Sequence, residues 1–414
     1  MTTMASDPIV IVGGGLAAGR LAAEYRESGG EADVTILSAE PDPPYHRPPL
    51  TKGFLRGEQD RDSTLLQPLP EWEEAVVEIR LETPVEAIHA DGHEVELTGG
   101  ERLPYGTLVV ATGARPRPLQ IPGADRVGVH TYRTLADAEA VSAAAEEAHS
   151  AIVIGGSFIG SETAASLRSR GLAVTQVEMG PTLMPQLRCP DLSAQLVQLY
   201  RAEGVDVRLE TQVEELTGNG RLLTGARTDD GETVEAYLAI VGVGVEPNVE
   251  LAQAAGADVD DGIVVDERFR SSLQDVYAIG DVARYPDPTS GRQRRIEHWS
   301  SADAQGAHLG RQLAGSRAAY DELPVFFTQL FGRKLQVLGD TERAAECVLR
   351  GSLDEGRLIG FHLDEGKRLV GAVVHGESAD VAVELEELIR RAVVVDDPVR
   401  LLDENLRPVD AVVA

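Results

Sequence analysis

A glycine-rich turn after a short β-branched run occurs twice in this chain, and this duplication constrains the fold more than any other feature. In the first copy the run Ile9–Val12 leads into the turn 13–18, which reads G-x-G-x-x-A. A helix is predicted over 16–28 and a second strand over 33–37, with the acid Glu40 just beyond it. The glycines of such a unit let the backbone approach a pyrophosphate, the helix N-terminus offers amide donors, and the acid accepts ribose hydroxyls. We therefore predict a dinucleotide site in this unit.

The second copy has the same order of elements. A strand over 151–154 leads into the turn 155–160, and a helix is predicted up to residue 170, before a second strand that ends next to Glu178. Ser157 takes the middle position of the turn, where glycine would let the backbone approach the phosphates. We predict a second dinucleotide site in this unit. The alternatives are that Ser157 weakens the contact with the pyrophosphate, or that the unit serves only as a scaffold.

Two more segments, 108–113 and 276–281, are buried-strand runs that each reach a glycine. Asp281, the last residue of the second segment, directly follows Gly280. Such an acid can cap a helix, or it can hold a ribityl hydroxyl where the strand end meets the next helix. Taken with the two glycine turns, these segments indicate a chain built to bind two dinucleotides.

Composition narrows the class of protein. The chain has 414 residues, which favours two or three domains, and a net charge of −30, which argues against nucleic acid or an anionic membrane as partner. Residues 1–8 lack the pattern of an export signal, and no apolar run reaches the ~20 residues of a membrane span, so we expect a soluble, cytoplasmic protein. With only Cys189 and Cys347, neither a disulfide framework nor a metal site is expected.

These motifs resemble those of the two-dinucleotide flavoproteins of the glutathione reductase superfamily, and more narrowly the NADH-dependent ferredoxin reductases, the putidaredoxin reductase-like family. Besides the two turns, five segments carry the resemblance, which covers nearly the whole chain. They are 44–52 (PYHRPPLTK), 111–117 (ATGARPR), 132–135 (YRTL), 262–266 (GIVVD) and 295–299 (RIEHW). The resemblance implies an α/β fold with two Rossmann-like domains and a C-terminal α+β domain. The FAD domain would comprise 1–112 and 245–320, the NAD domain 113–244 and the C-terminal domain 321–414.

The resemblance also implies the residues that contact FAD. They are Gly13, Gly15, Leu16, Ala17, Glu40, Arg47, Lys52, Val85, Ala111, Thr112, Gly113, Arg133, Gly280, Asp281, Glu297 and Trp299. Lys52, with Glu162 as its partner, would polarise the reactive edge of the flavin and act as the catalytic pair. Lysine accounts for only three of the 38 basic residues, which favours this role over that of an ordinary surface lysine. Trp299 could instead be a core residue, and His298 is expected to be structural.

Nicotinamide dinucleotide contacts are implied in the same way. They are Gly155, Ser157, Phe158, Ile159, Gly160, Glu178, Gly244 and Phe327. Phe327 would replace a tryptophan that stacks near the nicotinamide in the family, although it and Phe326 could be core residues that point to opposite faces of a strand. Glu178 would favour NADH, because a carboxylate repels a 2′-phosphate and the next residue, Met179, offers no arginine.

The implied function is transfer of hydride from NADH to FAD, then of single electrons to a small acidic [2Fe–2S] ferredoxin or rubredoxin. That protein would feed a haem-thiolate monooxygenase or a Rieske dioxygenase. Disulfide reductases of the superfamily carry a C-x₄-C pair, but no cysteine precedes Cys189 here, so the acceptor should be external. An NADH-binding protein like apoptosis-inducing factor, or a reductase for quinone or nitrite, is the alternative.

Docking of an acidic redoxin to a chain of this charge would need a local basic patch. Arg292, Arg294 and Arg295 are candidates, and a solvated loop is the alternative. We expect a monomer or a weak homodimer, with no metal, nucleic acid or membrane as partner.

Overall fold

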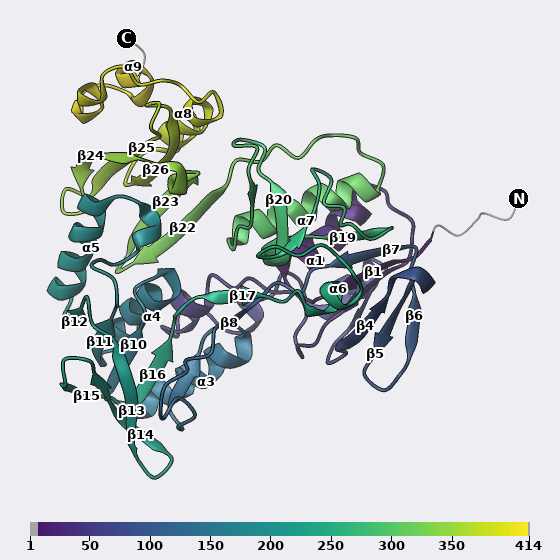
Figure 1. Ribbon diagram of the computed structural model, residues 1–414, viewed down its shortest axis with the longest axis horizontal. Helices are drawn as coiled ribbons and strands as arrows, with labels where there is room; N and C mark the ends of the chain where they lie inside the picture. The colour runs from purple at the N-terminus through teal and green to yellow at the C-terminus, as the bar shows by residue number, and fades with distance from the viewer. Residues whose placement is uncertain (1–6, 413–414) are drawn as a thin grey trace, which may run out of the picture. The chain divides into compact units, whose positions relative to one another are not determined.

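A computed structural model describes residues 7–412 of the chain. Residues 1–6 lie outside the described residues. They form most of the stretch 1–8, for which the sequence predicts no export signal. The described chain divides into two compact units (Figure 1). One contains the chain up to His46 with Arg61–Arg115 and Val245–Glu322, and the other contains Arg47–Asp60, Pro116–Gly244 and the chain from Leu323 onward.

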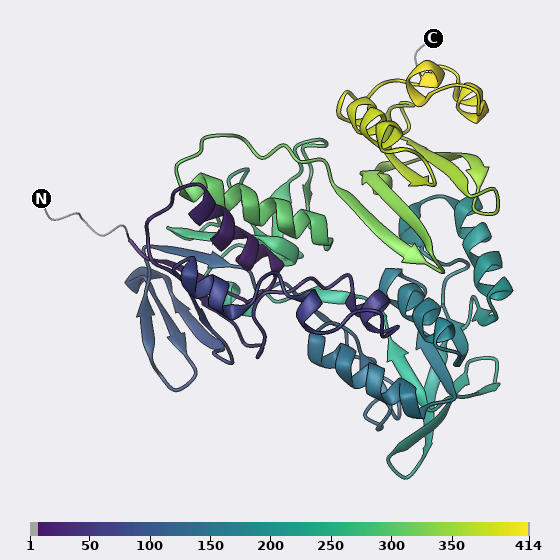
Figure 2. The same cartoon turned by 180° about the vertical axis from the view of Figure 1, so that it is seen from behind.

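The first unit is built on a parallel sheet of order β19-β7-β1-β2-β3. Its strands are β1 (Ile9–Val12), β2 (Val34–Leu37), β3 (Val77–Arg80), β7 (Thr107–Val110) and β19 (Val276–Ala278). All four residues of β1 are buried, as expected for an internal strand covered on both faces. Helices α1 (Leu16–Glu27) and α7 (Trp299–Leu313) lie side by side, as Figures 1 and 2 show from opposite sides.

Smaller elements complete this unit. They are the antiparallel sheet of β4 (Val85–His89), β5 (Glu94–Leu97) and β6 (Arg102–Pro104), the sheet of β18 (Ile263–Val264), β20 (Ala283–Pro286) and β21 (Gln293–Arg294), and helices α2 (Leu69–Glu74) and α6 (Glu250–Ala254). The short strands β8 (Ala114–Pro116) and β17 (Val245–Pro247) pair with each other.

The second unit repeats the parallel arrangement in a sheet of order β12-β11-β10-β16-β9. The strands are β9 (Val129–Thr131), β10 (Ser150–Ile154), β11 (Ala173–Val177), β12 (Val205–Arg208) and β16 (Leu238–Val241). The accompanying elements are helices α3 (Leu135–Glu147), α4 (Phe158–Ser169) and α5 (Pro190–Ala202), and an antiparallel sheet of β13 (Val213–Asn219), β14 (Leu222–Thr228) and β15 (Thr233–Glu235). A capping box between Thr134 and Asp137 begins α3.

The same unit ends in an antiparallel sheet of order β22-β23-β26-β25-β24. Its strands are β22 (Val325–Leu330), β23 (Arg333–Gly339), β24 (Glu346–Ser352), β25 (Arg357–Leu363) and β26 (Leu369–His375). Helices α8 (Ala379–Arg390) and α9 (Pro408–Val412) follow, and Leu385 and Leu388 of α8 share a buried cluster with Phe361 of β25. The α/β class predicted from the sequence is confirmed. None of the described helices combines the length and apolarity that a membrane span requires.

Candidate active site

The first glycine turn presents an open helix N-terminus. Gly13 has φ +113°, and a Cβ there would lie 2.2 Å from the carbonyl oxygen of Ala111, so this position requires glycine. Gly15 is the N-cap of α1, and no heavy atom lies within 4 Å of the place its Cβ would take. Leu16 and Ala17 begin the helix, and the N-cap provides no side-chain hydrogen bond to its first amides. This opening fits the pyrophosphate of a dinucleotide.

Glu40 is held beside the end of β2. The hydroxyl of Tyr45 donates to Glu40 Oε2 at 2.5 Å, and the Glu40 amide donates to Ser38 Oγ at 3.1 Å. A carboxylate at the end of the second strand is the group that accepts ribose hydroxyls in such folds. Tyr45 is not among the predicted site residues, although it belongs to the segment 44–52.

The ends of β7 and β19 carry five more of the predicted FAD residues, Ala111, Thr112, Gly113, Gly280 and Asp281. Asp281 lies in the short turn Gly280–Val282 after β19. The amide of Gly280 donates to Gln305 Oε1 at 2.8 Å, whereas Gln305 Nε2 is buried and has no partner among the described residues. A buried amide donor of this kind is normally satisfied, so a bound ligand is a natural partner. Sequence reasoning missed Gln305, because one glutamine in a helix carries no signal.

Trp299 is not a core residue, since 37 % of its surface is exposed. Its Nε1 donates to Nδ1 of His46 at 2.9 Å, and Glu297 forms an ion pair with Arg295. Burial lowers the pKa of His298 to about 4, so this imidazole is neutral near pH 7, as expected for a structural residue. The remaining FAD prediction in this unit, Val85, is half-buried at the start of β4.

In the second unit the structure brings Lys52 and Glu162 together. Lys52 Nζ lies 2.6 Å from Glu162 Oε2, and the two side chains are 9 % and 5 % exposed. Thr51 Oγ1 donates to the same oxygen at 2.6 Å, and Thr328 Oγ1 donates to Glu162 Oε1 at 2.7 Å. Lys52 also donates to the carbonyl of Pro48 at 3.2 Å. Burial of two charges is tolerated only with such pairing, and it rules out an ordinary surface lysine at this position.

The segment Leu50–Phe54 is a short helical stretch with a kink at Lys52, whose φ of −119° and ψ of −108° are not helical. Side chains tie it to the segment 132–135. Arg47 donates to the carbonyl of Arg133 at 2.7 Å, and the Tyr132 hydroxyl donates to the carbonyl of Leu50 at 2.5 Å. Two motifs separated in sequence therefore form one substructure.

The second glycine turn is arranged around Glu178. Its Oε2 accepts the amide of Gly156 at 2.6 Å, and its Oε1 accepts the amide of Gly180 at 2.7 Å. Ser157 is the N-cap of α4, and its hydroxyl makes only a long bond of 3.4 Å to the carbonyl of Gly242. The carboxylate thus lies at the turn, where a dinucleotide ribose is bound in such folds.

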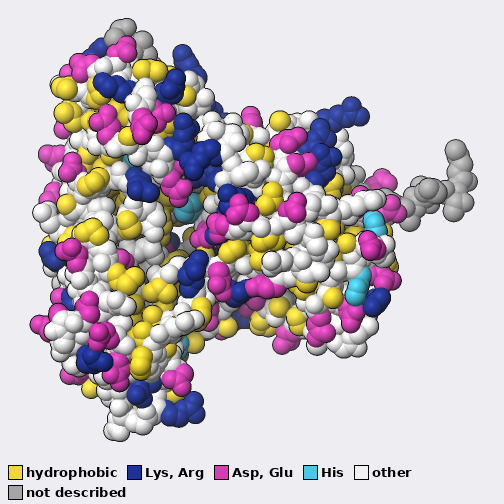
Figure 3. All heavy atoms as spheres, viewed as in Figure 1, with side chains coloured by type: hydrophobic (Ala, Val, Ile, Leu, Met, Phe, Trp, Pro, Cys, Tyr) yellow, Lys and Arg dark blue, Asp and Glu magenta, His cyan; other side chains and the backbone are white. Residues whose placement is uncertain are grey.

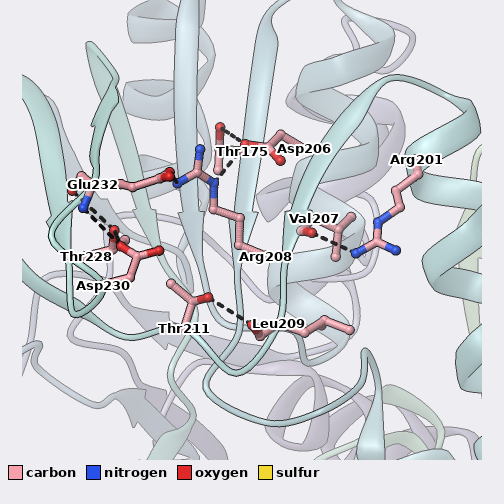
Figure 4. A network of polar contacts seen from close by, with 10 residues as sticks. All are labelled: Thr175, Arg201, Asp206, Val207, Arg208, Leu209, Thr211, Thr228, Asp230 and Glu232. Atoms are coloured by element: carbon pink, nitrogen blue, oxygen red, sulfur yellow. Dashed lines mark hydrogen bonds and ion pairs between the residues drawn. The ribbon is translucent and has the colours of Figure 1, made fainter.

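An arginine does lie beside Glu178 in the fold, although none is adjacent in sequence. The Glu178 amide donates to the carbonyl of Arg208 on the neighbouring strand β12. Figure 4 shows the Arg208 guanidinium held by two carboxylates, Asp206 at 2.9 Å and Glu232 at 2.8 Å. Its charge is therefore largely offset.

Strand β22 presents its aromatic side chains to opposite faces, as predicted. Phe326 packs edge-on against Phe158 of α4, with ring centroids 5.2 Å apart. Phe327 is 41 % exposed and lies under the ammonium of Lys334, 4.8 Å from the ring centroid. The other predicted NAD residues lie directly after β10 (Gly155), at the start of α4 (Ile159, Gly160) and after β16 (Gly244).

Comparisons with known proteins agree with this geometry. A family described as "Pyridine nucleotide-disulphide oxidoreductase" matches residues 7–306. The chain belongs to this family. A second family, "Reductase C-terminal", matches residues 325–407. The resemblance seen in the sequence is confirmed, and so are the cofactors, FAD and a nicotinamide dinucleotide, for which the two glycine turns are suited.

Members of known activity are similar over most of the chain. Rhodocoxin reductase of Rhodococcus erythropolis is 37 % identical over 88 % of this chain and 85 % of that protein. The ferredoxin–NAD(+) reductase component of the anthranilate 1,2-dioxygenase system of Burkholderia cepacia is 34 % identical over 97 % of this chain and 98 % of that protein. The crystal structure of the ferredoxin reductase for the CYP199A2 system from Rhodopseudomonas palustris matches with a TM-score of 0.93, at 31 % identity over 99 % of this chain and 100 % of that one.

Proposed function

We propose that this protein is an FAD-dependent ferredoxin–NAD(+) reductase that passes single electrons to a small acidic [2Fe–2S] ferredoxin or rubredoxin serving an oxygenase. The observation that carries the proposal is the buried ion pair of Lys52 with Glu162. No cysteine precedes Cys189 in the sequence, so that part of the chain offers no thiol to accept the electrons. The acceptor is therefore another molecule.

The residues of the chain contribute charge and position. FAD, when bound, converts a two-electron hydride into single-electron transfers. Lys52 supplies a fixed positive charge for the negative charge that develops on reduction, and a preorganised charge in a dry site is most effective there. Glu162 offsets the unfavourable burial of that ammonium.

NADH is the proposed donor. Glu178 occupies the ribose end of the second glycine turn, where its charge would repel a 2′-phosphate. Arg208 accepts the Glu178 amide through its backbone carbonyl, and Asp206 and Glu232 already bind its guanidinium. The site therefore has a repulsive acid, and the guanidinium of Arg208 is already engaged.

The redoxin partner is proposed because ferredoxin reductases of oxygenase systems are among the relatives described above. Of the three arginines predicted to dock it, Arg294 pairs with Asp287 at 2.8 Å and Arg295 pairs with Asp261 at 3.1 Å, so two charges are offset. Acidic and basic side chains are interspersed on the face shown in Figure 3. We therefore do not expect residues 292–295 to attract the redoxin through a broad basic field.

Steady-state NADH oxidation against a panel of two-iron ferredoxins and rubredoxins tests this function, with quinone and nitrite acceptors for comparison. Fast reduction of one redoxin is the expected result. A slow, air-stable reduced complex would instead favour the protein like apoptosis-inducing factor, and preference for quinone would move the chain to another class. The three-domain division and the cytoplasmic location stay predictions from the sequence.

A further inference from the structure

The two oxygens of the Glu162 carboxylate differ in how they are held. Oε2 accepts from both Lys52 and Thr51, whereas Oε1 accepts from Thr328 alone among the residues that the structure describes. A buried acceptor that loses its donor is left with its full desolvation penalty. Loss of the Thr51 hydroxyl would leave Oε2 paired with Lys52, but loss of the Thr328 hydroxyl would leave Oε1 with nothing.

Thr328 reaches Glu162 because strand β22 lies along helix α4. Phe326 and Thr328 are two residues apart in the strand and so share one face. Phe158 and Glu162 are four residues apart in the helix and also share one face. The ring contact of Phe326 with Phe158 and the hydrogen bond of Thr328 with Glu162 therefore form one continuous seam.

The seam restricts the carboxylate more than the ion pair alone would. A Lys52–Glu162 contact by itself tolerates several rotamers of both long side chains, because the ammonium has three rotatable donors on a flexible stem. With Oε1 fixed by Thr328, which is fully buried, the remaining oxygen faces Lys52 in one orientation. The ammonium lies between this oxygen and the carbonyl of Pro48.

We propose that Thr328 is a positioning residue for the proposed reaction. It holds Glu162 in the orientation that pairs with Lys52, and thereby fixes the Lys52 ammonium. The inference rests on the proposed function, in which that ammonium acts on the flavin. It gives the strand β22, outside both glycine-turn segments, a defined part in hydride transfer.

The test compares Thr328→Val, Thr328→Ser and Thr51→Val in the flavin-loaded protein. Thr163→Val is the matched control, because Thr163 is also fully buried on α4 and its hydroxyl donates to the carbonyl of Ile159 at 2.7 Å. The readouts are the rate of flavin reduction by NADH in stopped flow, the NADH concentration that gives half the maximal rate, the flavin midpoint potential and the Tm.

We expect Thr328→Val to reduce the maximal rate about tenfold, as for loss of one hydrogen bond to a charged group, with the half-saturating NADH concentration changed by less than about twofold. The midpoint potential should become more negative, because a misplaced cation stabilises the reduced ring less. Thr328→Ser should restore both values, Thr51→Val should have a smaller effect, and Thr163→Val should have none.

A double variant tests whether Thr328 acts through Lys52. Lys52→Met with Thr328→Val should reduce flavin no more slowly than Lys52→Met alone, since the two share one pathway. Slowing by Thr328→Val that adds to the slowing by Lys52→Met overturns the inference. A Thr328→Val variant that reduces its flavin as fast as Thr163→Val also overturns it. So does slow reduction that Thr328→Ser does not restore and that is accompanied by a lower Tm. If Lys52→Met itself reduces at the native rate, the proposed role of Lys52 fails first.

Discussion

The indole Nε1 of Trp299 donates a hydrogen bond of 2.9 Å to Nδ1 of His46, and the two rings lie 5.6 Å apart. An acceptor nitrogen cannot carry a proton, so this bond exists only while His46 is neutral. Burial lowers the pKa of His46, and the nearby Asp303 opposes this in part. The bond is therefore present at neutral pH and lost as the pH falls below about 6.5, the ordinary histidine value.

Tryptophan emission should report that loss. The chain contains two tryptophans, of which Trp72 is fully buried and Trp299 is partly exposed. A pH titration should show a change with a midpoint below about 6.5 that disappears in Trp299→Phe and in His46→Gln. Trp72→Phe is the control and should keep it. A midpoint that survives in His46→Gln would assign the titration to another group.

Retention of FAD should depend on Glu40 and on the tyrosine that holds it. Glu40→Ala should weaken FAD binding by about tenfold or more, as for loss of a hydrogen bond to a charged group, and Tyr45→Phe by less. The flavin-to-protein absorbance ratio after dialysis measures this. Glu27→Ala, an exposed position at the end of α1, should leave the ratio unchanged. Full occupancy in Glu40→Ala would remove Glu40 from the site.

Coenzyme preference should depend on Glu178 and on the pairing of Arg208. We expect kcat/KM to favour NADH over NADPH by about a hundredfold, because a carboxylate and a phosphate a few Å apart repel each other by several kcal/mol before screening. Glu178→Ala should reduce the ratio, and adding Asp206→Ala with Glu232→Ala should reduce it further by freeing Arg208. Glu147→Ala, exposed at the end of α3, is the control. Equal use of both coenzymes by the native protein would contradict the assignment.

Stability should fall in acid because of His362. This side chain is fully buried, its Nε2 donates to the carbonyl of Leu187 at 2.6 Å, and burial lowers its pKa to about 4. The unfolded chain binds the proton near pH 6.5 and the folded one only near pH 4, so stability present above about 6.5 is lost as the pH falls toward 4. At about pH 5 the loss amounts to roughly 2 kcal/mol.

Thermal melts between about pH 7.5 and pH 5 measure this loss. The fall in stability should be smaller in His362→Gln, whatever the absolute stability of that variant. His375→Gln is the control, since His375 is more exposed and bonds to the carbonyl of Lys334. The same pH slope in His362→Gln and in the native protein would show that this histidine does not titrate on unfolding.

Most of the fold could be predicted from contiguous patterns in the sequence. The two glycine turns, their strands and their acids are local features, and a tight strand-to-helix turn needs the same residues wherever it occurs. The sequence therefore predicted β1, α1 and β2 to within a residue or so, and it predicted the repeated unit around β10 and α4 equally well. The segment 44–52 and the later motifs added the resemblance to a family, which the comparisons confirm.

The tertiary structure alone decided which distant side chains meet. Three hydrogen bonds join segments that no spacing rule connects. They link the Thr328 hydroxyl to Glu162, the Glu178 amide to the carbonyl of Arg208, and the Gly280 amide to Gln305. The two cysteines are far apart in the sequence, but their sulfurs lie near the same glycine. A Cβ on Gly360 would lie 3.2 Å from the sulfur of Cys347 and 3.7 Å from that of Cys189. Such contacts depend on the crossing of a strand over a helix or of one sheet over another. That geometry is set by the packing of whole apolar faces, so a single threonine, arginine or glutamine leaves no mark of it in the sequence.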